Sequence, residues 1–267
     1  MNGILSDFSA SALTTAIKTN LFDWYRYWGR SPNIDCKTGR HLTWSLTGIP
    51  FAFLNAVFDT QLPSEGGDKI IADTLAYFRS RSVTHLSWYV EPGTEMLELG
   101  RLLSSHSLTY DEGMPGMAVD LALSEQPTPP GSKIVPVKNR EMLQVWGHTL
   151  WLGYQMSIPG EDICFELFAS LGFELPLQSY IAYLDGQPVA TSQLFLSAGV
   201  AGIYCVAVLP EARRQGIGAA ITLAPLLDAR TLGYRIGILQ SSPMGYPVYR
   251  RLGFQEYCKL NRYVWKV

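Results

Sequence analysis

A short stretch between residues 206 and 220 holds residue types that can bind a phosphate group. An apolar run ends at Pro210, a polar turn follows, and Gly216 and Gly218 stand where a helix is expected to begin. Glycine leaves backbone N–H groups open to a close ligand, and the first turn of a helix offers unpaired N–H groups and partial positive charge to an anion. Arg213 and Arg214 add formal charge directly before the glycines. This pattern predicts a pyrophosphate-binding loop.

Three alternatives compete with this interpretation. A dinucleotide-binding fingerprint needs a third glycine at the position that Ile221 occupies. A Walker loop needs a Gly-Lys-Ser/Thr ending, which the stretch lacks. The third alternative is a capped helix whose glycines only allow close packing. The residues on both sides of the loop bear on the choice.

These surroundings resemble the GCN5-related N-acetyltransferase (GNAT) superfamily. Its acyl-CoA signature, Arg/Gln-x-x-Gly-x-Gly/Ala, is matched by Arg213-Arg-Gln-Gly216-Ile-Gly218, after an apolar strand that ends Val206-Ala207-Val208-Leu-Pro210. The family's second signature, a helix that bears a tyrosine and ends in Gly-Phe, is matched by residues 243–254 with Tyr249. The resemblance covers residues 134–267. It implies the GNAT acyl-CoA N-acyltransferase fold, an α/β architecture with a mixed α+β sheet.

The resemblance also implies a role for each matched residue, with acetyl-CoA as the cosubstrate. Pantetheine is expected along the strand before the loop, which splays from its neighbour, and the pyrophosphate on the loop amides. The implied cofactor-binding residues are Val206, Ala207, Val208, Arg213, Arg214, Gln215, Gly216, Ile217, Gly218, Ala219 and Ser242. The implied catalytic groups are the N–H of Val208, which stabilises the oxyanion, and the hydroxyl of Tyr249, which protonates the leaving thiolate. A core aromatic is the alternative role for Tyr249.

Two parts of the implied site have no assigned residue. An ammonium acceptor must lose a proton before it attacks, and many relatives use a glutamate on the strand before the loop, but residues 202–209 contain no acid. A water relay or an acid elsewhere, such as Glu161, Asp162 or Glu166, stays open as the alternative. The acceptor pocket is implied along residues 146–156, where Trp146 and Trp151 either line it or pack in the core.

Composition and element order divide the chain into two halves. Residues 125–133 contain three prolines and a glycine, which predicts a linker between a domain at 1–124 and a domain at 134–267. The expected helices of the second domain cover 139–154, 161–171, 216–232 and 246–252. Its expected strands cover 133–136, 180–185, 188–196, 202–209 and 235–240, with a hairpin turn at Asp185-Gly186.

The end of the first half shows the same order of elements. Expected helices at 68–79 and 94–104 alternate with expected strands at 85–90 and 117–121, about 150 residues before their counterparts. We therefore expect two tandem GNAT-like units, the first of them degenerate. Its counterpart of the pyrophosphate loop carries Glu65 and Asp68 instead of arginines, and like charges repel.

Composition excludes several classes of partner. The chain has 21 basic and 23 acidic residues, a net charge of −2, whereas proteins that bind nucleic acid through phosphate contacts usually carry a basic surplus. No apolar run approaches the roughly 20 residues of a membrane span. The four cysteines and four histidines are scattered, which predicts no metal site and reduced thiols in the cytoplasm.

The sequence thus predicts an N-acyltransferase that moves an acetyl group from acetyl-CoA to an amine by direct attack. The expected partner is a small-molecule or peptide amine, and a homodimer is left open. A non-catalytic acyl-CoA-binding module or sensor is the alternative, and a nucleotide-binding domain is a third.

Overall fold

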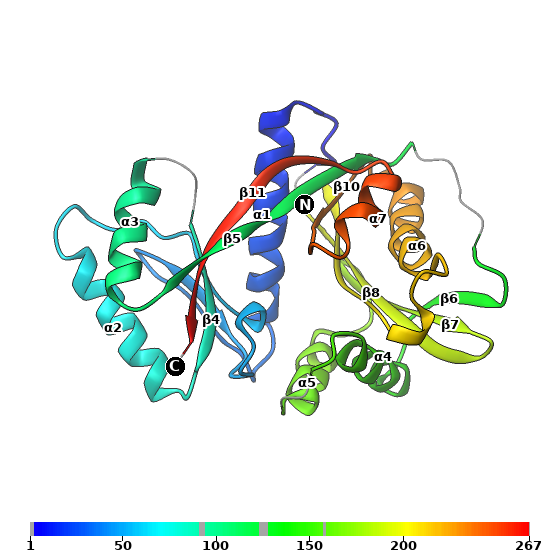
Figure 1. The fold of residues 1–267 in the computed structure, drawn as a ribbon, viewed down its shortest axis with the longest axis horizontal. Helices are drawn as coiled ribbons and strands as arrows, with labels where there is room; N and C mark the ends of the chain where they lie inside the picture. The colour runs from blue at the N-terminus through cyan, green and yellow to red at the C-terminus, as the bar shows by residue number, and fades with distance from the viewer. Residues whose placement is uncertain (1–2, 91–93, 123–127, 157–158, 267) are drawn as a thin grey trace. The chain divides into compact units, whose positions relative to one another are not determined.

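The computed structural model describes residues 3–90, 94–122, 128–156 and 159–266, and the chain forms two compact units. Unit 1 contains Met1–Trp24, Pro115–Ser157 and Phe168–Cys258, and unit 2 contains Tyr25–Met114, Ile158–Leu167 and Lys259–Val267. Figure 1 traces the elements of both along the chain. Each unit combines a mixed sheet with helices, which agrees with the expected fold class.

Five strands from the second half of the sequence form most of the sheet in unit 1. They are β6 (Ser132–Pro136), β7 (Leu177–Leu184), β8 (Gln187–Ser197), β9 (Val200–Val208) and β10 (Ile236–Gln240). The first four are antiparallel neighbours, and β9 pairs in parallel with β10. At the predicted hairpin turn, Asp185 and Gly186 have φ values of 49° and 81°. Positive φ at both positions is what a two-residue type I′ hairpin requires.

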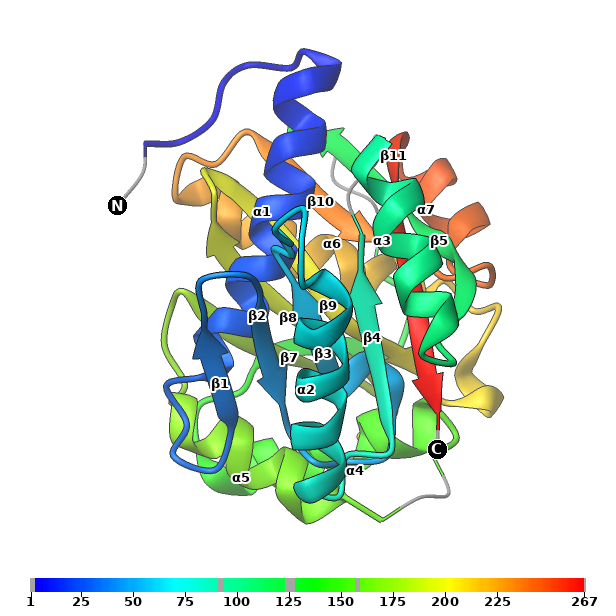
Figure 2. The same cartoon turned by 90° about the vertical axis from the view of Figure 1, so that its left-hand side faces the viewer.

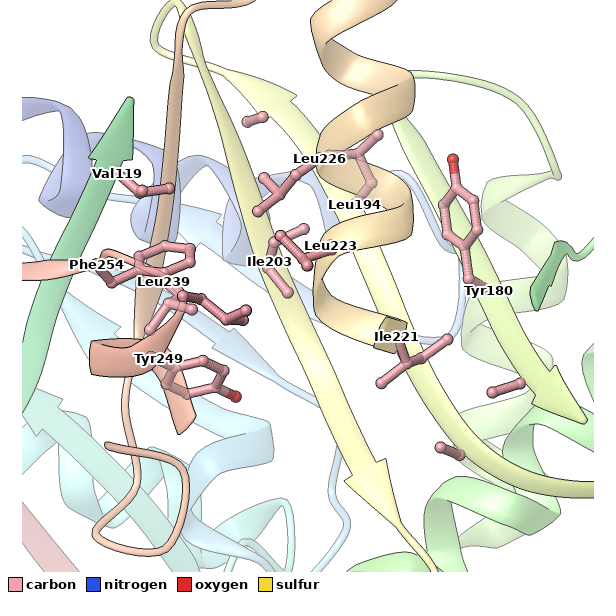
Figure 3. Close-up of a cluster of buried hydrophobic side chains, with 14 of the residues drawn as sticks. Val119, Tyr180, Leu194, Ile203, Ile221, Leu223, Leu226, Leu239, Tyr249 and Phe254 are labelled. Carbon is pink, nitrogen blue, oxygen red and sulfur yellow. The ribbon is translucent and has the colours of Figure 1, made fainter. Parts of the chain in front are cut away.

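Helices pack on both faces of this sheet. On one face, α6 (Ile217–Thr231) and α7 (Tyr246–Arg251) bury an apolar cluster against residues such as Ile203 (Figure 3). Neighbouring residues of a strand point to opposite faces. Accordingly, Tyr204 lies on the other face, where its ring stacks on Trp24 of α1 (Ala10–Trp28) with 4.4 Å between ring centroids. The remaining helices of this unit are α4 (Arg140–Gly153) and the end of α5 (Glu161–Leu171).

Unit 2 has a smaller sheet with the strand order β1-β2-β3-β4-β11. Its elements are β1 (Asp35–Thr38), β2 (Thr43–Leu46), the 3-10 helix Ala52–Leu54, β3 (Asn55–Phe58), α2 (Gly67–Ser80), β4 (His85–Tyr89), α3 (Thr94–Ser105) and the end of β11 (Gln255–Lys266). Figure 2 shows α2 and α3 in front of these strands. The core of the unit contains Phe78 of α2, Trp88 of β4 and Trp265 of β11.

The last strand of each half of the sequence pairs with a strand from the other half. β5 (Thr109–Asp120) is antiparallel to β10, with Gly116 opposite Gln240, and β11 is antiparallel to β4, with Arg262 opposite Tyr89. This exchange is one reason why the two units do not follow the expected division at 125–133. Lys133 of the expected linker lies in β6, and residues 123–127 lie outside the described residues. The domain boundaries at 124 and 134 stay a prediction.

The internal repeat is visible in the spacing of the elements. α2 begins at Gly67 and α6 at Ile217, 150 residues later, while β4 begins at His85 and β10 at Ile236, 151 residues later. In each unit the helix connects two parallel neighbours, β3 with β4 and β9 with β10. Sequence analysis did not predict α1 or the strands β1 to β3. No helix among the described residues is long and apolar enough to cross a membrane.

Candidate active site

The parallel strands β9 and β10 separate within unit 1. They pair only from Ala201 to Ile203 of β9, and β9 then continues for five residues, from Tyr204 to Val208. β10 ends at Gln240, one residue after its last paired position, Leu239. The backbone of β9 therefore lacks a strand partner on this side. We call the region between Tyr204–Val208 and Gln240 the strand split.

The ladder on the other side of β9 shows which N–H groups face the strand split. Leu209 donates its N–H to the carbonyl oxygen of Val189 over 2.9 Å, which makes these two residues a hydrogen-bonded pair with β8. In an antiparallel ladder such pairs alternate with pairs whose N–H groups point away. Val208 therefore directs its N–H group toward the strand split, and Ala207 directs its N–H toward β8. The register with β8 shifts between Thr191 and Gln193, where Cys205 has φ 51°. With Cys205 as the extra residue of this bulge, Val206 follows the same alternation and directs its N–H toward the strand split. Sequence analysis predicted this splayed strand.

The loop between β9 and α6 takes up left-handed backbone conformations at two positions. Arg214 has φ 62°, and Gly216, the residue before α6, has φ 83° and ψ −8°. Such alternation turns successive N–H groups toward one point and makes an anion-binding nest. In the described parts of the chain, the N–H groups from Arg214 to Gly218 have no acceptor, and the next one, from Ala219, donates to the carbonyl oxygen of Gly216. We call Arg214–Gly218 the nest.

Space is left open in front of the nest. Among the described residues, a Cβ added to Gly216 would approach only Pro129 Cγ, at 3.3 Å, and one added to Gly218 only Val208 Cγ2, at 3.6 Å. Arg214, Gln215 and Gly216 are exposed, whereas the side chain of Ile217 is buried in the core below α6. Ile217 can therefore contribute to binding only through its backbone.

Arg213 makes contacts that sequence analysis did not predict. Its Nε donates to the carbonyl oxygen of Val208 over 3.0 Å, and its Nη2 donates to the carbonyl oxygen of Gly153 over 3.1 Å. A Cβ on Gly153 would lie 2.8 Å from Ala207 Cβ and 3.4 Å from Val208 N. The guanidinium thus holds the end of α4 against the end of β9. Its charge remains beside the nest, but two of its donors are occupied by these carbonyl groups.

Tyr249 lies on α7 at the edge of the apolar cluster. The residue is only 8% exposed, and its ring centroid lies 5.9 Å from that of Phe254. Figure 3 shows its hydroxyl on the side of the ring away from Phe254. Burial raises the pKa of Tyr249 to about 12, and a hydrogen bond with Thr222 offsets part of this rise. The hydroxyl therefore keeps its proton at neutral pH and can act as a donor.

Ser242 lies in the turn between β10 and α7. Its Oγ accepts the N–H of Gly245 over 3.1 Å, and its carbonyl oxygen accepts the N–H of Tyr246 over 3.0 Å. The hydroxyl hydrogen of this exposed residue stays available for a ligand. The structure therefore gives Ser242 a local role in shaping the turn in addition to its implied contact with the cofactor.

The helix implied to line the acceptor pocket contributes mainly to the core. α4 begins as predicted, with the side chain of Asn139 accepting the N–H of Met142 over 2.8 Å. Trp146 is fully buried and donates its Nε1 hydrogen to the carbonyl oxygen of Ser192 over 3.1 Å. Trp151 is also buried. Of the two roles left open by the sequence, the core role fits Trp146.

The corresponding region of unit 2 shares the left-handed glycine before its helix, but it has neither a second left-handed residue two positions earlier nor the strand split. Gly66, the residue before α2, has φ 83° and ψ 4°, close to the values at Gly216. However, Val57 of β3 still pairs with Trp88, and only Phe58 follows it in the strand. Asp68 accepts a hydrogen bond from His106 Nε2 at 2.9 Å in the first turn of α2. These features agree with the predicted degenerate unit.

Comparison with known proteins identifies this part of the chain. Residues 176–256, which contain β7 to α7 and the nest, match the family model described as "Acetyltransferase (GNAT) domain". This segment therefore matches the GNAT family. The predicted resemblance is thereby confirmed. No curated protein matched the sequence.

Solved structures extend the GNAT fold to nearly the whole chain. A GCN5-related N-acetyltransferase from Kribbella flavida is 18% identical, with a TM-score of 0.65, over 98% of this chain and 96% of that chain. A tandem GNAT protein from the clavulanic acid biosynthesis pathway is 14% identical, with a TM-score of 0.56, over 93% and 95%. A GCN5-related N-acetyltransferase from Sphaerobacter thermophilus is 13% identical, with a TM-score of 0.61, over 85% of this chain and 80% of that chain. The expected tandem fold is confirmed.

Proposed function

We propose that the chain transfers an acetyl group from acetyl-CoA to the amine of a small molecule or peptide. The observation that carries the proposal is the continuity of the nest with the strand split, because the nest follows Val208 after only five residues. The nest suits a pyrophosphate. The outward N–H groups of Val206 and Val208 suit a linear chain that carries amide carbonyls, as pantetheine does.

The order of these groups sets the direction of the proposed cofactor. From a pyrophosphate in the nest, pantetheine runs back along β9 and meets Val208 before Val206. The thioester then lies nearer the point where β9 and β10 part. We therefore assign the oxyanion to the N–H of Val206 and a pantetheine amide to the N–H of Val208, a change from the role that sequence analysis gave Val208. A backbone donor placed in this way stabilises the charge that develops during attack.

The proposed reaction passes through a tetrahedral intermediate. The neutral amine attacks the thioester carbon, an N–C bond forms, and the C–S bond breaks as the oxyanion collapses. The proton that the amine nitrogen loses balances the proton that the sulfur gains. A thiol has an ordinary pKa of about 8.5, so complete transfer from Tyr249 to the thiolate would be uphill by about 5 kcal/mol. We therefore infer that Tyr249 stabilises the thiolate chiefly by donating a hydrogen bond.

A non-catalytic acyl-CoA-binding module is the second candidate. It is favoured by the composition of β9, which contains no aspartate or glutamate to accept the proton of an ammonium acceptor. An enzyme without such a group could still react, through the small fraction of neutral amine at pH 7 or through loss of the proton to water.

A cytoplasmic location is part of the proposal, since the four cysteines form no disulfide among the described residues.

Two measurements separate these functions. Saturating acetyl-CoA should raise the melting temperature, because a ligand that binds only the folded chain stabilises it. An adenine nucleotide should raise it less, because it lacks the pantetheine that the strand split would hold. Release of free thiol should then rise with at least one member of a panel of amines. Binding without thiol release across the panel would favour the module, and the absence of any shift would contradict both functions.

A further inference from the structure

Gln240 carries a buried hydrogen-bond donor that the fold does not use. The residue ends β10, and its Nε2 is buried with no hydrogen-bond partner in the described portion of the chain. A buried donor that has given up water without gaining an acceptor costs free energy. Such a group in a native structure calls for an explanation, and a catalytic role is one of the recognised ones.

Its position places this donor at the strand split. Leu239 pairs with Ile203 at the last position where β9 and β10 are joined, and Gln240 is the next residue. Leu239 packs in the cluster below α6, so the side chain of Gln240 points to the opposite face of the sheet. Its partner on the other neighbouring strand is Gly116, which has no side chain to pair with the amide.

The repeat supplies an internal comparison. β4 and β10 correspond at a spacing of 151 residues, so the counterpart of Gln240 in unit 2 is Tyr89. Tyr89 pairs with Arg262 on the neighbouring strand, whereas Gln240 pairs with Gly116. The hydroxyl of Tyr89 lies 3.2 Å from that of Tyr25, and Arg262 Nε donates to Asp111 over 2.8 Å. In the unit that lacks the strand split, the side chain at the corresponding position thus has a protein partner.

We propose that Gln240 is a catalytic residue that donates its Nε2 hydrogen to the thioester carbonyl oxygen of bound acyl-CoA. This inference rests on the proposed function. A donor at this point suits a carbonyl oxygen and not the attacking amine, whose lone pair must remain available. The amide would act beside the N–H of Val206, so the developing oxyanion receives one donor from each of the two separating strands. No proton is transferred, because the amide only donates a hydrogen bond.

The test uses the full chain and acetyl-CoA labelled with ¹³C at the thioester carbonyl. In wild type, binding should move the carbonyl ¹³C signal downfield, as hydrogen bonding polarises the C=O bond. Gln240→Met keeps a similar size and removes the donor, so this shift should become clearly smaller. The melting temperature of the free variant should be unchanged or higher, because a buried donor without a partner has been removed.

Gln193→Met is the matched control. Gln193 is a buried glutamine on β8 whose amide accepts from Trp24 Nε1 at 2.9 Å and donates to Ser179 Oγ at 3.1 Å. This variant should melt at a lower temperature than wild type while keeping the wild-type carbonyl shift. Gln240→Leu, which also removes the N–H donor and adds no ionisable group, serves as a second variant for the same measurement.

The outcomes separate this inference from the proposed function. Failure of wild type to bind acetyl-CoA contradicts the proposed function. Binding with the same carbonyl shift in wild type and Gln240→Met overturns only the role of Gln240. A melting temperature of Gln240→Met several degrees below wild type would also overturn it, since it would show that the amide has a partner in the free protein.

Discussion

Replacing Gly216 by alanine should separate ligand binding from folding, because the chain contains a matched control. Gly216 and Gly66 each stand directly before a helix. Both have φ 83°, and their ψ values are −8° and 4°. An alanine in this left-handed conformation costs about 1–2 kcal/mol. Within the described part of the chain, a new Cβ would meet only Pro129 Cγ, at 3.3 Å, at position 216 and no atom within 4 Å at position 66. Both variants should therefore fold.

The two variants should lose similar stability but differ in affinity for acetyl-CoA. For domains of this size, each kcal/mol lowers the melting temperature by about 2–4 °C. In Gly216→Ala, relaxation of the strained backbone turns N–H groups of the nest away from the pyrophosphate. Loss of one hydrogen bond to a charged group, worth about 1.5–3 kcal/mol, weakens binding about 10- to 100-fold. Gly66→Ala should bind as wild type does.

The assay is isothermal titration with acetyl-CoA, together with thermal melts, of wild type, Gly216→Ala and Gly66→Ala. Equal loss of affinity in both variants would show that the effect comes from general destabilisation. Full affinity in Gly216→Ala, despite the lower melting temperature, would refute the assignment of the pyrophosphate to the nest.

Three further predictions concern Tyr249 and Arg213. Tyr249→Phe should lower kcat with an amine acceptor about 10²- to 10³-fold, as loss of one transition-state hydrogen-bond donor does, and leave acetyl-CoA affinity nearly unchanged in titration; equal turnover would contradict the donor role. Because the pKa of Tyr249 is raised to about 12, its stabilising contribution is complete below pH 10 and is lost as pH rises through 12. From pH 8 to pH 11, wild type should therefore lose about 1 kcal/mol more unfolding free energy than Tyr249→Phe in denaturant titrations. Arg213→Glu should abolish cofactor binding, and Arg213→Gln should lower the melting temperature because Val208 and Gly153 lose their shared donor; unchanged binding and melting would contradict both of its roles.

Local patterns allowed much of the GNAT domain to be predicted. The positive φ values at Asp185, Gly186 and Gly216 belong to residue types that adopt them readily. The side chain of Asn139 caps α4 as its type and position predicted. Each of these features depends on residues within a few positions of one another, so the sequence contains the information directly.

Features that depend on distant residues were not predicted. The exchange of β5 and β11 joins strands through pairs such as Gln240 with Gly116, and alternation within one strand cannot show which partner it takes. α1 is different, because its buried residues Leu13, Ile17, Leu21 and Trp24 follow helical spacing. That signal was present in the sequence and could have identified the helix.

The same distinction applies to the candidate site. The sequence identified the nest because glycine and arginine types carry a local meaning. It could not show that Arg213 binds the carbonyl groups of Val208 and Gly153, since Gly153 lies 60 residues away. Nor could it show that Gln240 has a donor without a partner, because this depends on where β9 leaves β10 and on a glycine in β5.

Hydrogen–deuterium exchange with and without acetyl-CoA tests the central claim most directly, namely that the cofactor occupies the nest and the strand split of the GNAT domain. The N–H groups from Arg214 to Gly218 have no acceptor among the described residues, so they should exchange rapidly in the free chain. Acetyl-CoA should slow exchange in the segment from Val206 to Gly218 and leave the loop at Gly66 unchanged. Unchanged exchange from Val206 to Gly218, or protection at Gly66 instead, would contradict the account.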